Sequence, residues 1–236
     1  MSSVMKSYDL SFLILHGWQN RRPPGHWQYW LAGELANSGY PVEYPQLPEP
    51  DHPELEDWTA AIVKAAGRLE TRERVVVCHS LGCLAWLHAT TLLDAAGLPA
   101  LSPPGTGGDA GYRVVLVAPP GRTFLRETSE IARFAPEMWP KTPNSSGPSA
   151  IETLLVRSDG DPYCPVSEDL ALPRVPGLRT RVVPGQGHFD MNAGYGSWPG
   201  MLAWCTGRSE IVARRGEADG AAEADGALQA AAAQAL

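Results

Sequence analysis

The sequence predicts an α/β fold, a three-layer architecture in which helices cover both faces of a doubly wound, mostly parallel sheet. Two observations carry this prediction. Short apolar runs alternate along the chain with segments of helical periodicity, and this rhythm favours right-handed strand-helix-strand crossovers. Runs such as Val75 to Cys78 are also apolar at every position, as in strands that are buried on both faces.

The pattern places each element in turn. Strands are expected at residues 10–15, 42–44, 74–78, 112–117, 151–156 and 179–183. Helices are expected at 26–37, 54–69, 81–95, 124–134 and 198–214, the fourth with the weakest pattern. Two stretches rich in Pro and Gly interrupt the rhythm at 97–111 and 136–150. Long loops often serve as functional covers, so we expect 136–150 to cover a pocket and 97–111 to be an inert loop.

Composition and charge narrow the class of protein. The 236 residues are 44% hydrophobic and 19% charged, as in globular proteins, and 24 glycines and 22 prolines indicate long loops. A net charge of −7 without a Lys/Arg cluster argues against a nucleic-acid partner. No apolar run approaches the roughly 20 residues that cross a bilayer, and the N-terminus does not match a secretory signal. We therefore expect a cytoplasmic protein without membrane contact.

The end of the chain has a different composition. Residues 216–236 contain ten alanines and four acidic residues but no aromatic or basic side chain. Such a segment cannot bury a core, so we expect a folded domain over 1–215 and a disordered tail over 216–236. Without the tail's four acids the net charge is −3, which says little about a substrate. The four cysteines lack CxxC spacing and are expected to be reduced, and no metal site is expected.

The strongest signal for chemistry lies in RVVVCHSLGCLAWLHATT, residues 74–91. A β-branched run leads directly into Ser80, and a helical pattern follows at once, which is the context of a nucleophile elbow. Gly82 is the small residue that such a turn needs, whereas Cys78 stands where the GxSxG pattern has its first glycine. His79 is expected to pack in the elbow rather than act as a second base. The alternative for Ser80 is an ordinary helix N-cap.

An acid and a base follow in the order of an α/β-hydrolase triad, Ser then Asp then His. Asp159 and Asp161 come after the fifth expected strand, and His188 comes after the sixth. Open parallel sheets place their sites at the carboxyl ends of strands. An Asx turn before Pro162 and a surface histidine are the alternatives for the acid and the base. Three suitable residues in this order nevertheless favour nucleophilic catalysis by serine.

The remaining parts of such a site are a pair of oxyanion donors and a pocket. The first expected strand opens into a loop containing Gly17, where backbone N–H groups can stabilise an oxyanion. The expected donors are the N–H groups of Trp18 and Leu81. Aromatic side chains near these loops favour a small apolar or aromatic acyl group. The residues expected to line the pocket are Trp18, Trp139, Tyr163 and Phe189.

Together these motifs resemble a known family, the small serine hydrolases of the α/β-hydrolase superfamily, and within it the YdeN-like proteins and retinoblastoma-binding protein nine. The matching motifs are HGW at 16–18 with GHWQYWL to residue 31, CHSLG at 78–82, SDGDPYC at 158–164, GHF at 187–189 and GSWPGM at 196–201. The resemblance spans about Ser11 to Cys205. It implies Ser80 as nucleophile, Asp161 as acid and His188 as base. It also implies a compact six-stranded parallel sheet without a large cap, and no cofactor.

The expected activity is hydrolysis of a small-molecule ester or amide through an acyl-enzyme on Ser80. If Asp161 is not the acid, Asp159 is the next candidate. Two other functions are compatible with the same scaffold. One is an interaction protein without activity, because a fold does not dictate a function, and the other is an acyltransferase with the same nucleophile. The sequence indicates no particular protein partner.

Overall fold

A computed structural model describes residues 9–95, 111–135, 152–168, 172 and 178–207 of the chain. The described strands form a single six-stranded sheet in the order β2-β1-β3-β4-β5-β6, with every pair parallel. The strands are β1 (Leu10–Leu15), β2 (Val42–Glu43), β3 (Glu73–His79), β4 (Gly111–Val117), β5 (Glu152–Arg157) and β6 (Arg179–Val182). The helices are α1 (Trp27–Asn37), α2 (Leu55–Ala66), α3 (Leu81–Ala95), α4 (Arg122–Glu127), the 3₁₀ helix η1 (Ser129–Phe134) and α5 (Pro199–Cys205). The predicted α/β class and six-stranded parallel sheet are confirmed.

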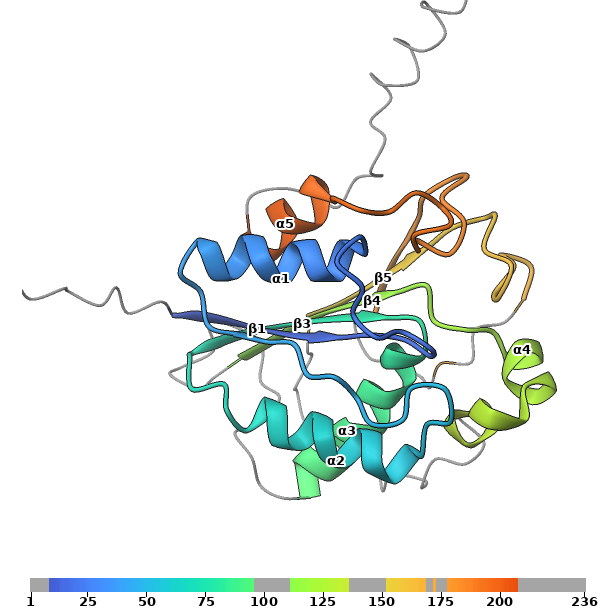
Figure 1. Ribbon diagram of the computed structural model, residues 1–236, viewed down its shortest axis with the longest axis horizontal. Coiled ribbons are helices and arrows are strands. Elements are labelled where there is room, and N and C mark those ends of the chain that lie inside the picture. The colour runs from blue at the N-terminus through green and yellow to red at the C-terminus, as the bar shows by residue number, and fades with distance from the viewer. Residues whose placement is uncertain (1–8, 96–110, 136–151, 169–171, 173–177, 208–236) are drawn as a thin grey trace, which may run out of the picture.

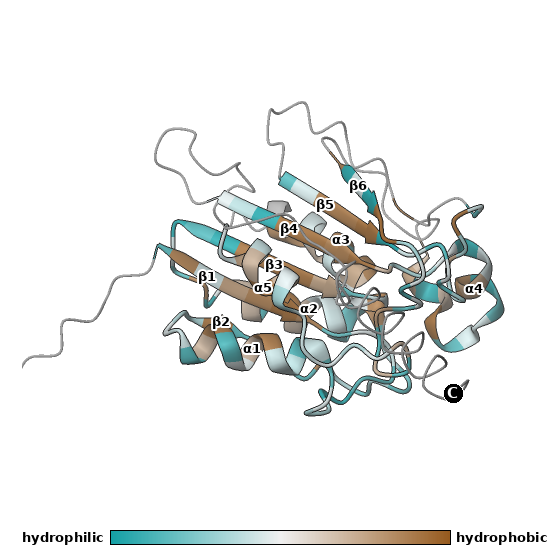
Figure 2. Ribbon diagram, turned by 90° about the horizontal axis from the view of Figure 1, so that it is seen from above, coloured by the Kyte–Doolittle hydropathy of each residue, from teal (hydrophilic) through white to brown (hydrophobic). Residues whose placement is uncertain are grey.

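Helices cover the sheet on two sides, with α1 and α5 on one face and α2 and α3 on the other (Figure 1). Alternate residues of the central strands therefore enter different cores. In β1, Leu13 and Leu15 belong to the core under α2 and α3, whereas Phe12 and Ile14 belong to the core under α1 and α5. Because both faces are buried, the strands are apolar at successive positions, as Figure 2 shows along β1, β3 and β4.

The strand order places the site. From β1 the chain moves to β2 on one side, and after α2 it returns to β3 on the other side of β1. The loop after β1 and the turn after β3 therefore lie next to each other at the carboxyl ends of the strands, where the order reverses. Open α/β sheets hold their ligands at such switch points. The helix α4, which follows β4, lies at this same end (Figures 1 and 2).

Three of the expected helices differ from their bounds by more than one residue. The segment expected as one helix over 124–134 forms α4 and η1, because Thr128 between them has extended backbone. The helix expected over 198–214 ends at Cys205, and Gly207 follows with φ +75, a left-handed conformation that suits glycine at a helix end. The helix α2 ends at Ala66 rather than residue 69.

Other expectations concern residues outside the described part of the chain. These are nearly all of the loops 97–111 and 136–150, and the tail 216–236. Within the described residues all four cysteines are buried and unpaired. No described helix is both long and apolar enough to span a membrane.

Candidate active site

The turn between β3 and α3 holds Ser80 in a left-handed conformation, with φ +53. For a residue with a side chain this conformation costs about 1–2 kcal/mol, so its surroundings must impose it. Two hydrogen bonds do so. The Ser80 N–H donates to the carbonyl of Val117 on β4 at 2.9 Å, and the Cys83 N–H donates to the carbonyl of Ser80 at 2.9 Å. Ser80 therefore sits on a tight strand-turn-helix, the geometry of a nucleophile elbow.

Two glycines allow the β1 loop (residues 16–22) to approach this turn. A Cβ on Gly82 would lie 2.5 Å from the carbonyl oxygen of His16, and a Cβ on Gly17 would lie 2.7 Å from the Cβ of Ser80. Neither position has room for a side chain. Cys78, in contrast, points into the core under α2 and α3 and is fully buried, so a thiol fits where the GxSxG pattern has glycine.

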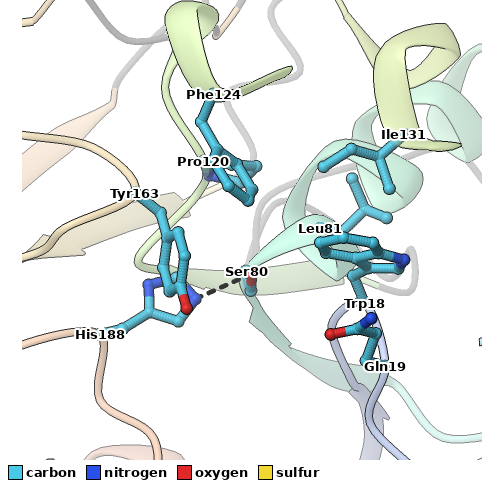
Figure 3. Close-up of a pocket in the computed structure, with 9 residues that line it drawn as sticks. All are labelled: Trp18, Gln19, Ser80, Leu81, Pro120, Phe124, Ile131, Tyr163 and His188. Carbon is cyan, nitrogen blue, oxygen red and sulfur yellow. Dashed lines mark hydrogen bonds between the residues drawn. The ribbon is translucent and has the colours of Figure 1, made fainter. Parts of the chain in front are cut away.

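Ser80, His188 and Asp161 form a hydrogen-bonded chain. The Oγ of Ser80 lies 2.9 Å from Nε2 of His188 (Figure 3), and Nδ1 of His188 lies 3.0 and 2.9 Å from the two carboxylate oxygens of Asp161. An ionised carboxylate only accepts, so Nδ1 carries the proton and Nε2 is left to accept from the serine hydroxyl. His188 and Asp161 are only 7% and 4% exposed.

The structure separates the two candidate acids. Asp159 accepts a hydrogen bond from the N–H of Gly185 at 2.6 Å. Asp161 contacts His188 and also accepts from the N–H of Tyr163 at 2.9 Å, so it makes an Asx turn as well.

Sequence reasoning missed Ser158, whose Oγ accepts from the N–H of Gln186 at 2.8 Å and joins the loop after β5 to the loop after β6.

A cavity of about 60 Å³ lies beside the Oγ of Ser80. In Figure 3, Trp18 and Leu81 lie on one side of Ser80, and Tyr163 and His188 on the other. None of the described residues that line the cavity is Asp, Glu, Lys or Arg. The described lining residues are Trp18, Gln19, Ser80, Leu81, Pro120, Phe124, Ile131, Tyr163 and His188.

Aromatic rings line this cavity on both sides of Ser80. The ring of Tyr163 meets His188 edge-on with centroids 4.5 Å apart, Phe124 lies 4.8 Å from Tyr163, and Trp18 lies 6.3 Å from Phe124. Sequence reasoning missed Phe124 and Ile131, although they follow β4 at the same end of the sheet, and that position is the signal that would have found them. Trp139 lies outside the described residues.

Phe189 does not line the cavity, contrary to expectation. It is fully buried, and its ring stacks on Trp198 with centroids 5.4 Å apart and planes at 16°. The reason is the backbone: Gly187 and Phe189 have φ +55 and +52, and these left-handed residues on either side of His188 turn successive side chains in different directions. His188 faces Ser80, whereas Phe189 enters the core under α1 and α5.

The backbone near Ser80 offers two N–H groups without an acceptor among the described residues, those of Trp18 and Leu81. Both residues line the cavity. The next N–H in the β1 loop, that of Gln19, donates instead to the carbonyl of Pro50 at 2.8 Å. The indole of Trp18 donates to the carbonyl of Asp51 at 3.0 Å, which fixes this loop beside Ser80.

Buried histidines support the site in their neutral form. Burial lowers the pKa of His16 and of His26 to about 4, and it lowers the pKa of His79 well below its ordinary value. Nδ1 of His16 donates to the carbonyl of Gly17 at 2.8 Å, and its Nε2 accepts from the N–H of Leu47 at 2.9 Å. His16 therefore braces the start of the β1 loop. Among the described residues no three His, Cys, Asp or Glu side chains converge as metal ligands.

The parallel sheet, the tight turn at Ser80 and the site at the switch point define an α/β-hydrolase. The chain matches the serine hydrolase family over residues 12–206 and belongs to that family. Two of the solved structures to which it is similar show the shared fold. One is the ydeN gene product from B. subtilis, with 23% identity, TM-score 0.60, and coverage of 84% of this chain and 97% of that one. The other is a putative YdeN-like hydrolase from Pectobacterium atrosepticum, with 19% identity, TM-score 0.57, and coverage of 83% and 88%. No curated protein matches the sequence.

Proposed function

We propose that the protein hydrolyses a small carboxylic ester, or an amide, through an acyl-enzyme on Ser80. The observation that carries this proposal is the continuous hydrogen-bonded chain from Ser80 through His188 to Asp161, opening on a cavity. Membership of the serine hydrolase family supports the same class of reaction.

The proposed reaction begins when Nε2 of His188 accepts the proton of the Ser80 hydroxyl as Oγ bonds to the carbonyl carbon. Asp161 stabilises the imidazolium that forms. The oxyanion accepts hydrogen bonds from the N–H groups of Trp18 and Leu81, each worth about 3–4 kcal/mol of transition-state stabilisation. The leaving group departs with the proton from His188. A water then gives a proton to His188 and attacks the acyl carbonyl carbon, and as the bond to Oγ breaks His188 returns that proton to Ser80, which releases the acid and the free enzyme.

The cavity favours a small, uncharged acyl group. Its volume of about 60 Å³ is well below that of pockets for drug-sized ligands, and its described lining offers no charged side chain to pair with an ionised acyl group. The rings of Trp18, Phe124 and Tyr163 offer flat apolar contacts. We propose that these residues bind the acyl group. The pocket role of Trp139 stays a prediction.

A fluorophosphonate probe tests the nucleophile. It should label the wild-type protein stoichiometrically but not Ser80→Ala, while Ser38→Ala, at the far end of α1, should label like wild type. Equal labelling of Ser80→Ala, or absence of labelling in the wild type, would contradict the proposal, and the second result would favour an inactive scaffold. Hydrolysis of p-nitrophenyl esters with and without added alcohols and amines then distinguishes a hydrolase from an acyltransferase.

A further inference from the structure

His79, the residue before Ser80, makes a bond that links the two ends of the site. It ends β3 and is 3% exposed, and its Nε2 lies 2.8 Å from the main-chain carbonyl oxygen of His188. A carbonyl oxygen can only accept, so Nε2 carries a proton and donates it to this hydrogen bond. The bond joins residues 109 positions apart in the sequence.

The ring of His79 is enclosed by other rings. Its centroid lies 5.3 Å from that of His26, 5.8 Å from Trp27 and 5.0 Å from His188 itself. Its Nδ1 has no hydrogen-bond partner among the described residues, and leaving such a buried acceptor unpaired costs about 1–3 kcal/mol. An apolar side chain would fill this space without that cost. Packing alone therefore does not account for a histidine here, whereas the bond from Nε2 does.

The main chain at His188 needs an external anchor. Both neighbours, Gly187 and Phe189, have left-handed backbone conformations, and for Phe189, which has a side chain, this conformation is strained. The stacking of Phe189 on Trp198 holds one side of the loop. The bond from His79 holds the carbonyl of His188, directly between the two left-handed residues.

We propose that His79 is a positioning residue for the reaction: its Nε2–H holds the main chain of His188 against the end of β3, so that the base is fixed relative to the nucleophile, which is the next residue of the chain. This inference rests on the proposed function of Ser80 and His188. His79 does not itself act on Ser80, because its Nε2 is committed to the carbonyl of His188. Its effect is on the distance and direction between Nε2 of His188 and Oγ of Ser80, now 2.9 Å.

A pair of variants separates positioning from packing. His79→Leu removes the donor while keeping most of the volume, and His79→Gln replaces it with an amide N–H at a similar distance from the backbone. With p-nitrophenyl acetate, and with rates expressed per site titrated by fluorophosphonate, His79→Leu should lower kcat by about 10–100-fold and change KM by less than about 3-fold. His79→Gln should recover kcat to within about 5-fold of wild type.

A purely structural role predicts a different result. In that case both variants lower the melting temperature, but kcat per titrated site stays at the wild-type value, and this outcome would overturn the proposal. A loss in His79→Gln as large as in His79→Leu would also overturn it.

If His79→Leu does not fold, ¹⁵N NMR of histidine-labelled wild-type protein decides. The histidine signal that is missing from the spectrum of His79→Gln belongs to His79. In the wild type this signal should show a proton on Nε2, and a proton on Nδ1 instead would refute the bond. Failure of the wild type to react with fluorophosphonate would count against the proposed function alone, because the NMR measurement does not depend on activity.

Discussion

Asp161 and Asp159 lie two positions apart in the sequence, but their carboxylates have different partners: Asp161 contacts His188, and Asp159 accepts from the N–H of Gly185. Asp161→Asn places an amide beside Nδ1 of His188 and favours the wrong tautomer, so kcat should fall by about 10⁴-fold. Asp159→Asn is the matched control, because it weakens only the bond to the Gly185 N–H, and it should keep kcat within a few-fold of wild type. Steady-state kinetics of both variants on one p-nitrophenyl ester measures the difference. A larger loss in Asp159→Asn would reverse the assignment of the acid.

Phe124 sets the depth of the proposed acyl pocket, because its ring packs against Tyr163 and Trp18 across the cavity. Phe124→Ala should open this wall and raise the ratio of kcat/KM for p-nitrophenyl octanoate over acetate by about 10-fold, since each methylene in an apolar pocket is worth roughly 1–3 kcal/mol. Tyr29→Ala, on the exposed outer face of α1, should leave the ratio unchanged. An unchanged ratio in Phe124→Ala would place the acyl group elsewhere.

At the scale of elements, the β1 loop and the turn after β3 meet at Gly17. Gly17→Ala puts a Cβ 2.7 Å from the Cβ of Ser80, so loop and nucleophile must move apart. We expect kcat/KM to fall by about 100-fold or more, because displacements near 1 Å cost that much. Gly33→Ala in α1 is the control, since its Cβ would meet nothing within 4 Å. It should keep full activity and stabilise the fold by about 0.5–1 kcal/mol. Wild-type activity in Gly17→Ala would show that the loop adapts freely.

For the whole molecule, buried neutral histidines make stability depend on pH. Burial lowers the pKa of His16, His26 and His88 to about 4, and it lowers the pKa of His79 well below its ordinary value. In the unfolded chain these groups titrate near 6.5, so the unfolded state binds more protons between pH 6.5 and 4. Stability should therefore be complete above about pH 6.5 and decrease as the pH falls toward 4, at about 1.4 kcal/mol per pKa unit for each group.

Urea unfolding followed at intervals from pH 7.5 to 4.5 measures this dependence. The free energy of unfolding should decrease steadily across the lower half of that range. A value that stays constant to pH 4.5 would mean that the histidines accept protons without unfolding. His88→Gln should reduce the slope, because it removes one of the groups that take up a proton on unfolding.

The properties that depend on neighbours in the sequence were predictable. Continuous apolar runs identified the buried strands, and the parallel six-stranded sheet is confirmed, because burial on both faces requires such runs whatever the strand order is. The bounds of β1 and α3 also agree with expectation, since a strand that turns sharply into a helix leaves a local pattern around Ser80. Ends of helices were less predictable, because Thr128 and Gly207 act through backbone conformation rather than through an apolar pattern.

What only the tertiary structure decided are contacts between segments far apart in the chain. The order of residues along the chain identified Ser80 and His188, and the residues alone left both Asp159 and Asp161 as candidates for the acid. In the folded chain it is Asp161, not Asp159, that contacts the imidazole. In the same way, Phe189 enters a core and Phe124 a cavity wall. The physical reason is that a residue's neighbours along the chain determine its local conformation, whereas the direction of its side chain and its partners depend on how the loops converge at the ends of the strands.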